Sequence, residues 1–210
     1  MQSSLPKQFM LLGGEPVVAR TINTFAEALP GAEIVVVLPE EHIAMWKNLA
    51  ARFDVAVHKC VAGGAERFHS VKAGIAALSD DVTSIMVHDG VRALITKKLI
   101  IRTALAVEDN DAVIPVVDVV DSYRRVTDSG SEIVPRSELR IVQTPQIFKS
   151  ETLRRAYEQE FDTSFTDDAS VVEAAGYKVA LEEGERENFK ITTPLDITLA
   201  RAIITAEGEM

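Results

Sequence analysis

The chain has 210 residues, of which 47% are apolar, a length and composition that suit one folded domain and exclude a disordered chain. Its formal net charge of −10 excludes a general affinity for nucleic acid or anionic membrane, because both need a basic surface. The single cysteine excludes a disulfide framework and a multi-cysteine metal site, and no apolar run reaches the ~18–20 residues of a membrane span. We therefore expect a cytoplasmic protein without nucleic-acid or membrane partners.

Short apolar runs alternate with helical patterns through the first half of the chain. Four runs predict strands buried on both faces, because their apolar residues continue without alternation: 34–38, 55–58, 85–87 and 112–117. Helical patterns precede or separate them at 16–29, 40–53, 66–79 and 96–108. This order predicts an α/β fold, a Rossmann-like, mostly parallel sheet flanked by helices, in which ligands gather beyond the carboxyl ends of the strands.

The segment 118–142 interrupts this alternation and predicts a protruding β-hairpin arm. Its two strands, 118–126 and 132–136, flank the turn 127–131. A two-stranded ribbon is marginal alone, so we expect the arm to pack against a second subunit and form a homodimer.

The remaining third of the chain returns to alternating elements. It predicts helices at 150–160 and 167–175, strands at 178–182 and 188–191, and a closing helix from Pro194. We find no repeat and no interdomain linker, so residues 1–210 are expected to form one domain.

Two short segments indicate a nucleotide site. In the first, 63–71, two glycines open a helix that carries Arg67 and Ser70 in its first two turns. In the second, 87–92, Asp89 follows the apolar run 85–87. Both would lie at the carboxyl edge of the sheet, where a nucleotide can be held by its base and its phosphates.

These segments belong to a series of motifs that run in one order along nearly the whole chain. The stretches are 6–9 (Pro-Lys-Gln-Phe), 63–71, 88–92, 135–139 (Pro-Arg-Ser-Glu-Leu), 143–146 (Gln-Thr-Pro-Gln), 166–170 (Thr-Asp-Asp-Ala-Ser) and 188–192 (Asn-Phe-Lys-Ile-Thr). Together they resemble the 2-C-methyl-D-erythritol 4-phosphate cytidylyltransferase family of the non-mevalonate isoprenoid pathway. The resemblance implies a nucleotidyltransferase that joins CTP and a polyol phosphate, with magnesium, and releases pyrophosphate.

The resemblance assigns roles to nine positions. Lys7 and Lys190 match the catalytic lysines, and Lys190 also matches the acceptor-phosphate pocket together with Arg136 and Thr166. In the family, the arginine comes from the arm of the neighbouring subunit. The nucleotide-binding positions are Gly64, Ala65, Arg67, Ser70 and Asp89.

Simpler interpretations stay open for several of these residues. Lys7 could be a solvated lysine, Arg67 could only brace its loop, and Asp89 could cap the following turn. Arg92 is as compatible with bracing as with ligand contact. The pair Asp167 and Asp168 opens a helix and is best explained as an N-terminal cap with an acidic first turn.

The sequence does not identify magnesium ligands. The four histidines, at 42, 58, 69 and 88, lack metal-ligand spacing, so the protein ligands of the metal are unknown.

The amino end departs from the family pattern. The family begins with a strand and a glycine-rich loop of the form Ala-Ala-Gly-x-Gly-x-Arg-Met-Gly, and Met1 falls where the methionine of that loop stands. We therefore expect Met1 to be an internal methionine of a longer natural protein. A chain without the loop is expected to bind CTP weakly and to turn over slowly or not at all.

Two other functions compete with this interpretation. Ribitol-5-phosphate cytidylyltransferase shares most of the motifs, although 135–139 and 166–177 resemble the methylerythritol enzyme more closely. An inactive nucleotide-binding or scaffolding protein would explain the departure at the amino end, but it has no need of an acceptor pocket. A dinucleotide-dependent oxidoreductase is poorly supported, because no Gly-x-Gly-x-x-Gly follows a first strand.

Overall fold

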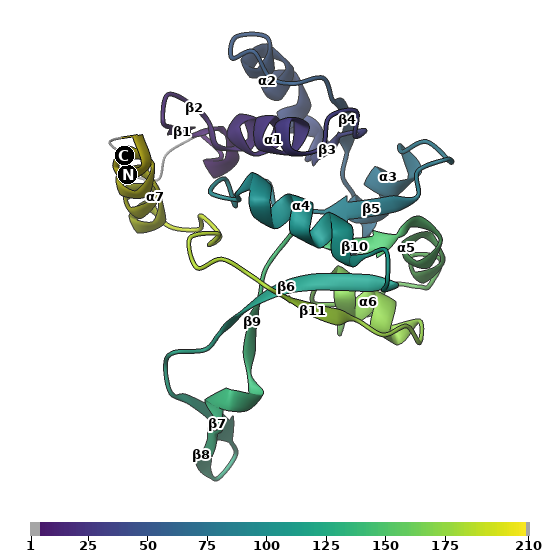
Figure 1. Cartoon of the computed structure of the whole chain (residues 1–210), viewed down its shortest axis with the longest axis vertical. Helices are drawn as coiled ribbons and strands as arrows, with labels where there is room; N and C mark the ends of the chain where they lie inside the picture. The colour runs from purple at the N-terminus through teal and green to yellow at the C-terminus, as the bar shows by residue number, and fades with distance from the viewer. Residues whose placement is uncertain (1–4, 209–210) are drawn as a thin grey trace.

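The computed structural model describes residues 5–208 as an α/β fold, a central sheet flanked by helices with a hairpin arm projecting away from it (Figure 1). Each predicted helix has a counterpart. The α-helices are α1 Val17–Ala28, α2 Glu40–Ala50, α3 Arg67–Ala76, α4 Lys97–Ala106, α5 Ser150–Ala156, α6 Asp168–Ala174 and α7 Pro194–Gly208. Two short 3-10 helices, η1 Lys7–Phe9 and η2 Arg136–Glu138, complete the helical elements.

The central sheet has five strands and mixed directions. Its strands are β5 Ser84–Val87, β6 Ala112–Asp118, β9 Arg140–Val142, β10 Gln146–Lys149 and β11 Ala180–Glu183, in the order β11-β6-β10-β5 with β9 also on β6. β11 runs parallel to β6, whereas β10 is antiparallel to β5 and β6, and β9 is antiparallel to β6. The α/β class is confirmed, but this sheet is not mostly parallel. A helical crossover preserves strand direction, whereas the chain leaves β6, forms the arm and returns directly along β6, which reverses it.

A separate parallel pair consists of β3 Val35–Leu38 and β4 Lys59–Ala62. Among residues 5–208, β3 pairs only with β4, and β5 only with β10, so each strand has one edge without a strand partner. Val36 and Leu38 are buried, whereas Val35 and Val37 are half-buried. The predicted burial on both faces therefore holds for only half of β3. Two-residue strands β1 Leu11–Leu12 and β2 Glu15–Pro16 form a small hairpin near the described amino end.

The predicted arm is present as β7 Tyr123–Thr127 and β8 Gly130–Val134, which are antiparallel (Figure 1). Nearly every residue of the two strands is exposed, including the apolar Val126 (84%) and Ile133 (75%). The use of this arm in a dimer stays a prediction.

The strand predicted at 55–58 is wrong, because β4 begins only at Lys59. Side chains form hydrogen bonds with the backbone groups that would otherwise pair with a neighbouring strand. Ala56 N–H donates to Asn23 Oδ1 at 2.9 Å, and Ala56 O lies 2.7 Å from His58 Nδ1. His58 Nε2 in turn accepts from the Trp46 indole at 2.9 Å, which fixes the ring.

The strand predicted at 188–191 is also wrong, because this segment forms no strand ladder. A single backbone bond, from Ile191 N–H to Val91 O at 2.9 Å, ties it to the loop after β5. Asn188 is fully buried there, so the segment is a packed connection next to the site described below.

The largest core cluster lies where α3, α5 and α6 cover β5, β6 and β10. Its fully buried side chains each contribute about 1.5–3 kcal/mol when removed from water. They include Phe148, Leu153, Val171 and Val172. A second cluster joins η1, α1, β3 and α2 around Trp46, which stacks on Phe9 at 5.9 Å between ring centroids.

The expectation about the amino end concerns Met1 and what would precede it, which lie outside the described residues. Within residues 5–208, no helix is both long enough and apolar enough to cross a bilayer.

Candidate active site

The loop between β4 and α3 packs so closely on the helix that position 64 requires glycine and position 63 favours it. A Cβ atom on Gly64 would lie 2.4 Å from the Cβ of His69, and one on Gly63 would lie 2.7 Å from Ser70 Oγ. Gly64 N–H donates to Ser70 Oγ at 3.1 Å, and that hydroxyl donates to Glu66 O at 3.2 Å. Ser70 therefore holds the loop against α3. Gly64 and the neighbouring Ala65 stay exposed, where their backbone can approach a ligand.

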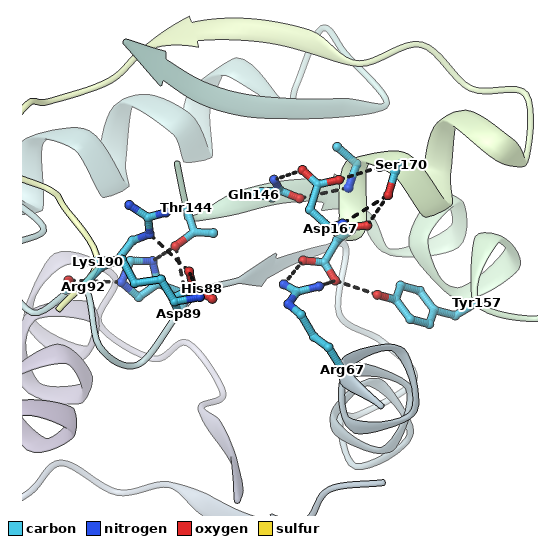
Figure 2. A network of polar contacts seen from close by, with 12 residues as sticks. Arg67, His88, Asp89, Arg92, Thr144, Gln146, Tyr157, Asp167, Ser170 and Lys190 are labelled. Atoms are coloured by element: carbon cyan, nitrogen blue, oxygen red, sulfur yellow. Dashed lines mark hydrogen bonds and ion pairs between the residues drawn. The ribbon is translucent and has the colours of Figure 1, made fainter. Parts of the chain in front are cut away.

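Arg67, the first residue of α3, is fixed by the first residue of α6. Its guanidinium forms two bonds to Asp168, NH1 to Oδ1 at 2.9 Å and NH2 to Oδ2 at 2.5 Å (Figure 2). The Asp168 side chain is fully buried, and it also accepts from the Tyr157 hydroxyl at 2.6 Å. Burial and the Asp168 carboxylate raise the pKa of Tyr157, so the phenol stays protonated and donates. This geometry favours bracing as the role of Arg67.

Asp89, just beyond β5, is the anionic centre of a second cluster. Arg92 Nε lies 3.2 Å and Lys190 Nζ 3.3 Å from its Oδ2 (Figure 2). Burial alone would raise the pKa of Asp89, but the charges of Lys190, Arg92 and Arg67 lower it, so the carboxylate is ionised at neutral pH. Two cations thus share one carboxylate at the carboxyl edge of the sheet.

A hydrogen-bonded chain behind Asp89 fixes its backbone. Asp89 N–H donates to Thr144 Oγ1 at 3.1 Å, so the Thr144 hydroxyl is free to donate to His88 Nδ1 at 2.9 Å. The second ring nitrogen of His88 lies 3.4 Å from Arg92 O, which makes Nε2–H the donor of the neutral tautomer. Burial lowers the pKa of His88 to about 4, so the ring is neutral at pH 7.

Asn188 connects the segment that carries Lys190 to Thr144 and to Arg92. Its Nδ2 donates to Thr144 O at 2.8 Å, and its own carbonyl accepts from Arg92 NH1 at 2.9 Å. The fully buried Asn188 therefore sets where the following Lys190 emerges. The exposed half of the Lys190 side chain faces solvent beside Asp89, where it can reach an anion.

The structure brings some of the predicted site residues together. Lys190 contacts Asp89, and Arg67 lies near enough to lower the pKa of Asp89. Gly64, Ala65 and Ser70 occupy the loop and first turns of the helix that Arg67 begins.

Three predicted site residues lie outside these contacts. Lys7 is exposed in η1, next to Gln8, which shares a cavity wall with Asp89 and Lys190. Thr166 is exposed just before the cap of α6. Arg136 begins η2, at the end of the arm strand β8, and donates to Val120 O at 2.8 Å.

The prediction that Asp167 caps a helix is confirmed. Asp167 accepts from Ser170 N–H at 2.9 Å while Ser170 Oγ accepts from Asp167 N–H at 3.1 Å, a reciprocal capping box. The Gln146 side chain forms two further hydrogen bonds at this cap (Figure 2): its Nε2 donates to Asp167 Oδ2, and its Oε1 accepts from Ala169 N–H.

Sequence reasoning assigned no role to Thr144, His88, Tyr157 or Asn188. Thr144 and His88 stood inside motifs that carried the resemblance, so their positions were marked but their contacts were not. Tyr157 stood in no motif, and its only signal was a single aromatic residue in a predicted amphipathic helix.

Comparisons with known proteins identify the family. Residues 1–206 match the family described as 2-C-methyl-D-erythritol 4-phosphate cytidylyltransferase. The chain belongs to this family. It is 49% identical over 205 residues to the cytidylyltransferase of that name from Bacteroides thetaiotaomicron, covering 97% of this chain and 93% of the relative. The corresponding protein of Bacteroides fragilis is 48% identical over 206 residues, with the same coverage.

Solved structures give the same result. The crystal structure of 4-diphosphocytidyl-2C-methyl-D-erythritol synthase from Anaerococcus prevotii superposes with a TM-score of 0.84 at 29% identity, covering 97% of this chain and 92% of that one. The 2-C-methyl-D-erythritol 4-phosphate cytidylyltransferase of Thermus thermophilus has a TM-score of 0.77 at 32% identity, covering 95% and 94%.

We predict that Arg67→Ala lowers the free energy of unfolding by about 2–3 kcal/mol. The predicted loss is smaller than the ~3–5 kcal/mol expected when one partner of a fully buried ion pair is removed, because the Arg67 side chain is partly exposed although Asp168 is buried. Urea unfolding measures the change, with the exposed Arg155→Ala of α5 as the control. A loss no larger than that of Arg155→Ala would contradict the bracing role.

We also predict that the neutral His88 makes stability depend on pH. The unfolded histidine takes up a proton near pH 6.5 and the folded one only near pH 4, so the unfolded state binds more protons in this window. Stability therefore falls as the pH drops from about 6.5 to about 4, by up to ~3 kcal/mol.

Urea unfolding at pH 7 and pH 4.5 tests this prediction. His88→Gln, which keeps an acceptor for Thr144 but does not titrate, should lose less stability between the two pH values than the unaltered chain. The exposed His69→Gln serves as the control. Equal losses in the unaltered chain and in His88→Gln would remove His88 as the source.

Proposed function

We propose that this chain transfers the cytidylyl group of CTP to 2-C-methyl-D-erythritol 4-phosphate in isoprenoid precursor synthesis. The observation that carries the proposal is the cluster of Lys190 and Arg92 on Asp89, near the loop that precedes α3. An anionic acceptor and an anionic donor can both be held where a few cations stand at the carboxyl edge of a sheet. The names of the relatives support this donor and acceptor, and we further propose a cytoplasmic location.

The reaction needs positioning and charge neutralisation rather than a protein nucleophile. An oxygen of the acceptor phosphate attacks the α-phosphorus of CTP as the bond to the β-phosphate breaks, and pyrophosphate leaves. In this proposal Gly64 and Ala65 contact the cytidine through their backbone, and Ser70 keeps their loop in place. Lys7 and Lys190 neutralise the charge that develops on the phosphate oxygens.

Magnesium fits the donor chemistry of this site. Mg²⁺ in nucleotide enzymes is usually held by one or two carboxylates and by substrate phosphates. Asp89 is ionised and would hold the ion as a single carboxylate together with the phosphates, because residues 5–208 contain no group of three or more His, Cys, Asp or Glu side chains that could hold a metal. The ion would neutralise charge on the triphosphate, and the side chains already described would orient it.

We further propose that the arm completes the acceptor pocket of a second subunit. The exposed Val126 and Ile133 on a two-stranded ribbon support this, because such a ribbon is marginal without a packing partner. Arg136, at the base of the hairpin, would then reach the site that contains Thr166 and Lys190 of the other subunit.

Lys190→Ala is predicted to lower kcat/KM for the acceptor phosphate by about 10- to 100-fold, the effect of losing one charge-assisted hydrogen bond. Initial rates of pyrophosphate release at varied acceptor concentration measure this. Lys98→Ala, at an exposed position on α4, is the matched control and should leave the rates unchanged. Ribitol 5-phosphate, offered in parallel, should be used less well. Unaltered kinetics in Lys190→Ala would remove this lysine from the site.

Mixing two impaired variants tests the arm. Arg136→Ala damages only the arm and Lys190→Ala only the receiving site, so a mixed dimer has one intact site in two. Random reassociation of equal amounts should therefore recover about a quarter of the unaltered activity. Unmixed variants provide the baseline. If mass measurements demonstrate mixed dimers but the mixture recovers no activity, Arg136 does not act across subunits.

A further inference from the structure

The segment 157–166 joins α5 to α6 and ends at Thr166, and aromatic contacts hold both of its ends on α3. Tyr157, which is 2% exposed, stacks on Phe68 with 4.7 Å between the ring centroids and 22° between the ring planes. Phe165, next to Thr166, stacks on the same ring at 5.7 Å. The second residue of α3 therefore packs against the beginning and the end of the segment that leads to Thr166.

The Tyr157 hydroxyl fixes a carboxylate that α3 also binds. Asp168 is fully buried, and its Oδ1 accepts from the Tyr157 hydroxyl at 2.6 Å and from Arg67 NH1 at 2.9 Å. The stacked ring leaves the phenol little freedom to turn. A guanidinium forms two parallel bonds to a carboxylate only in one relative orientation. Tyr157 therefore sets the orientation in which Asp168 meets Arg67.

This carboxylate lies between the two loops to which the proposed function assigns the substrates. On one side, Arg67 begins α3 after the loop that contains Gly64 and Ala65. On the other side, Asp168 begins α6 two residues after the exposed Thr166. A shift of Asp168 relative to Arg67 would therefore change the position of Thr166 relative to the glycine loop.

We propose that Tyr157 is a positioning residue whose hydroxyl, through Asp168 and Arg67, sets Thr166 against the loop that contains Gly64. The buried phenol lies too deep to contact either substrate, so its effect is indirect. The inference rests on the proposed function, because that function assigns the acceptor to Thr166 and the cytidine to Gly64. The Tyr157 hydroxyl would thus contribute to acceptor recognition from outside the acceptor pocket.

Tyr157→Phe removes this hydroxyl and keeps the stacked ring. We expect the KM for the acceptor phosphate to rise about 10-fold, the lower end of the effect of one hydrogen bond to a charged group. The KM for CTP should rise less, because Ser70 holds the Gly64 backbone through a separate hydrogen bond. Initial rates of pyrophosphate release at varied concentrations of each substrate measure both constants. Tyr177→Phe, a half-buried tyrosine of the same core cluster, is the matched control and should change neither.

A measurement without substrates separates this inference from the proposed function. NMR follows amide exchange of Ser70, whose N–H closes the first turn of α3, and of Ser170, whose N–H binds the cap of α6. In Tyr157→Phe both amides should exchange about 10-fold faster, because loss of the hydrogen bond to Asp168 loosens the start of each helix. In Tyr177→Phe neither amide should change.

The two measurements have distinct outcomes. Faster exchange at Ser170 alone, or at neither amide, overturns the inference, because Tyr157 would then not act across the carboxylate. A fall in kcat with both KM values unchanged, or equal rises of both, also overturns it. If both amides exchange faster but the unaltered chain shows no acceptor-dependent release of pyrophosphate, the link between the loops is confirmed and the proposed function fails.

Discussion

One carboxylate, Asp89, organises the candidate active site, because cations from two distant parts of the chain share a single oxygen of it. The ion pairs hold Lys190 and Arg92 at the carboxyl edge of the sheet, and the buried Asn188 and Thr144 fix the backbone around them. Two positive charges on one negative charge leave the cluster cationic. This local excess can attract phosphate groups even though the whole chain carries a net charge of −10.

A second ion pair connects the parts of the site that would hold different substrates. Arg67 begins the helix behind the glycine loop, and Asp168 begins the helix that follows Thr166. Their two bonds, with the Tyr157 hydroxyl on the same carboxylate, tie these two loops together. A displacement of one loop would therefore move the other, and in the proposed function this would couple nucleotide binding to the acceptor pocket.

The sequence predicted what depends on local pattern and missed what depends on distant partners. Hydrophobic periodicity located the helices, and the rule for carboxyl edges placed Asp89 on the same side of the sheet as the glycine loop before Arg67. Lys190 was assigned to the site only through the resemblance. Sequence reasoning misplaced the strand at 55–58, because side chains from other elements bind that backbone, and it missed the antiparallel return of β10 from the arm. The contacts of Thr144 and Tyr157 join residues far apart in the chain, which no pattern along it can reveal.

In the proposed function, the cationic cluster on Asp89 presents an acceptor phosphate to CTP. The most direct measurement is the initial rate of pyrophosphate release by this chain with CTP and Mg²⁺, with and without 2-C-methyl-D-erythritol 4-phosphate. We expect slow release that requires the acceptor and yields a CDP-linked product in equal amount. Bound CTP without any acceptor-dependent release would contradict the claim and leave the chain as a nucleotide-binding protein.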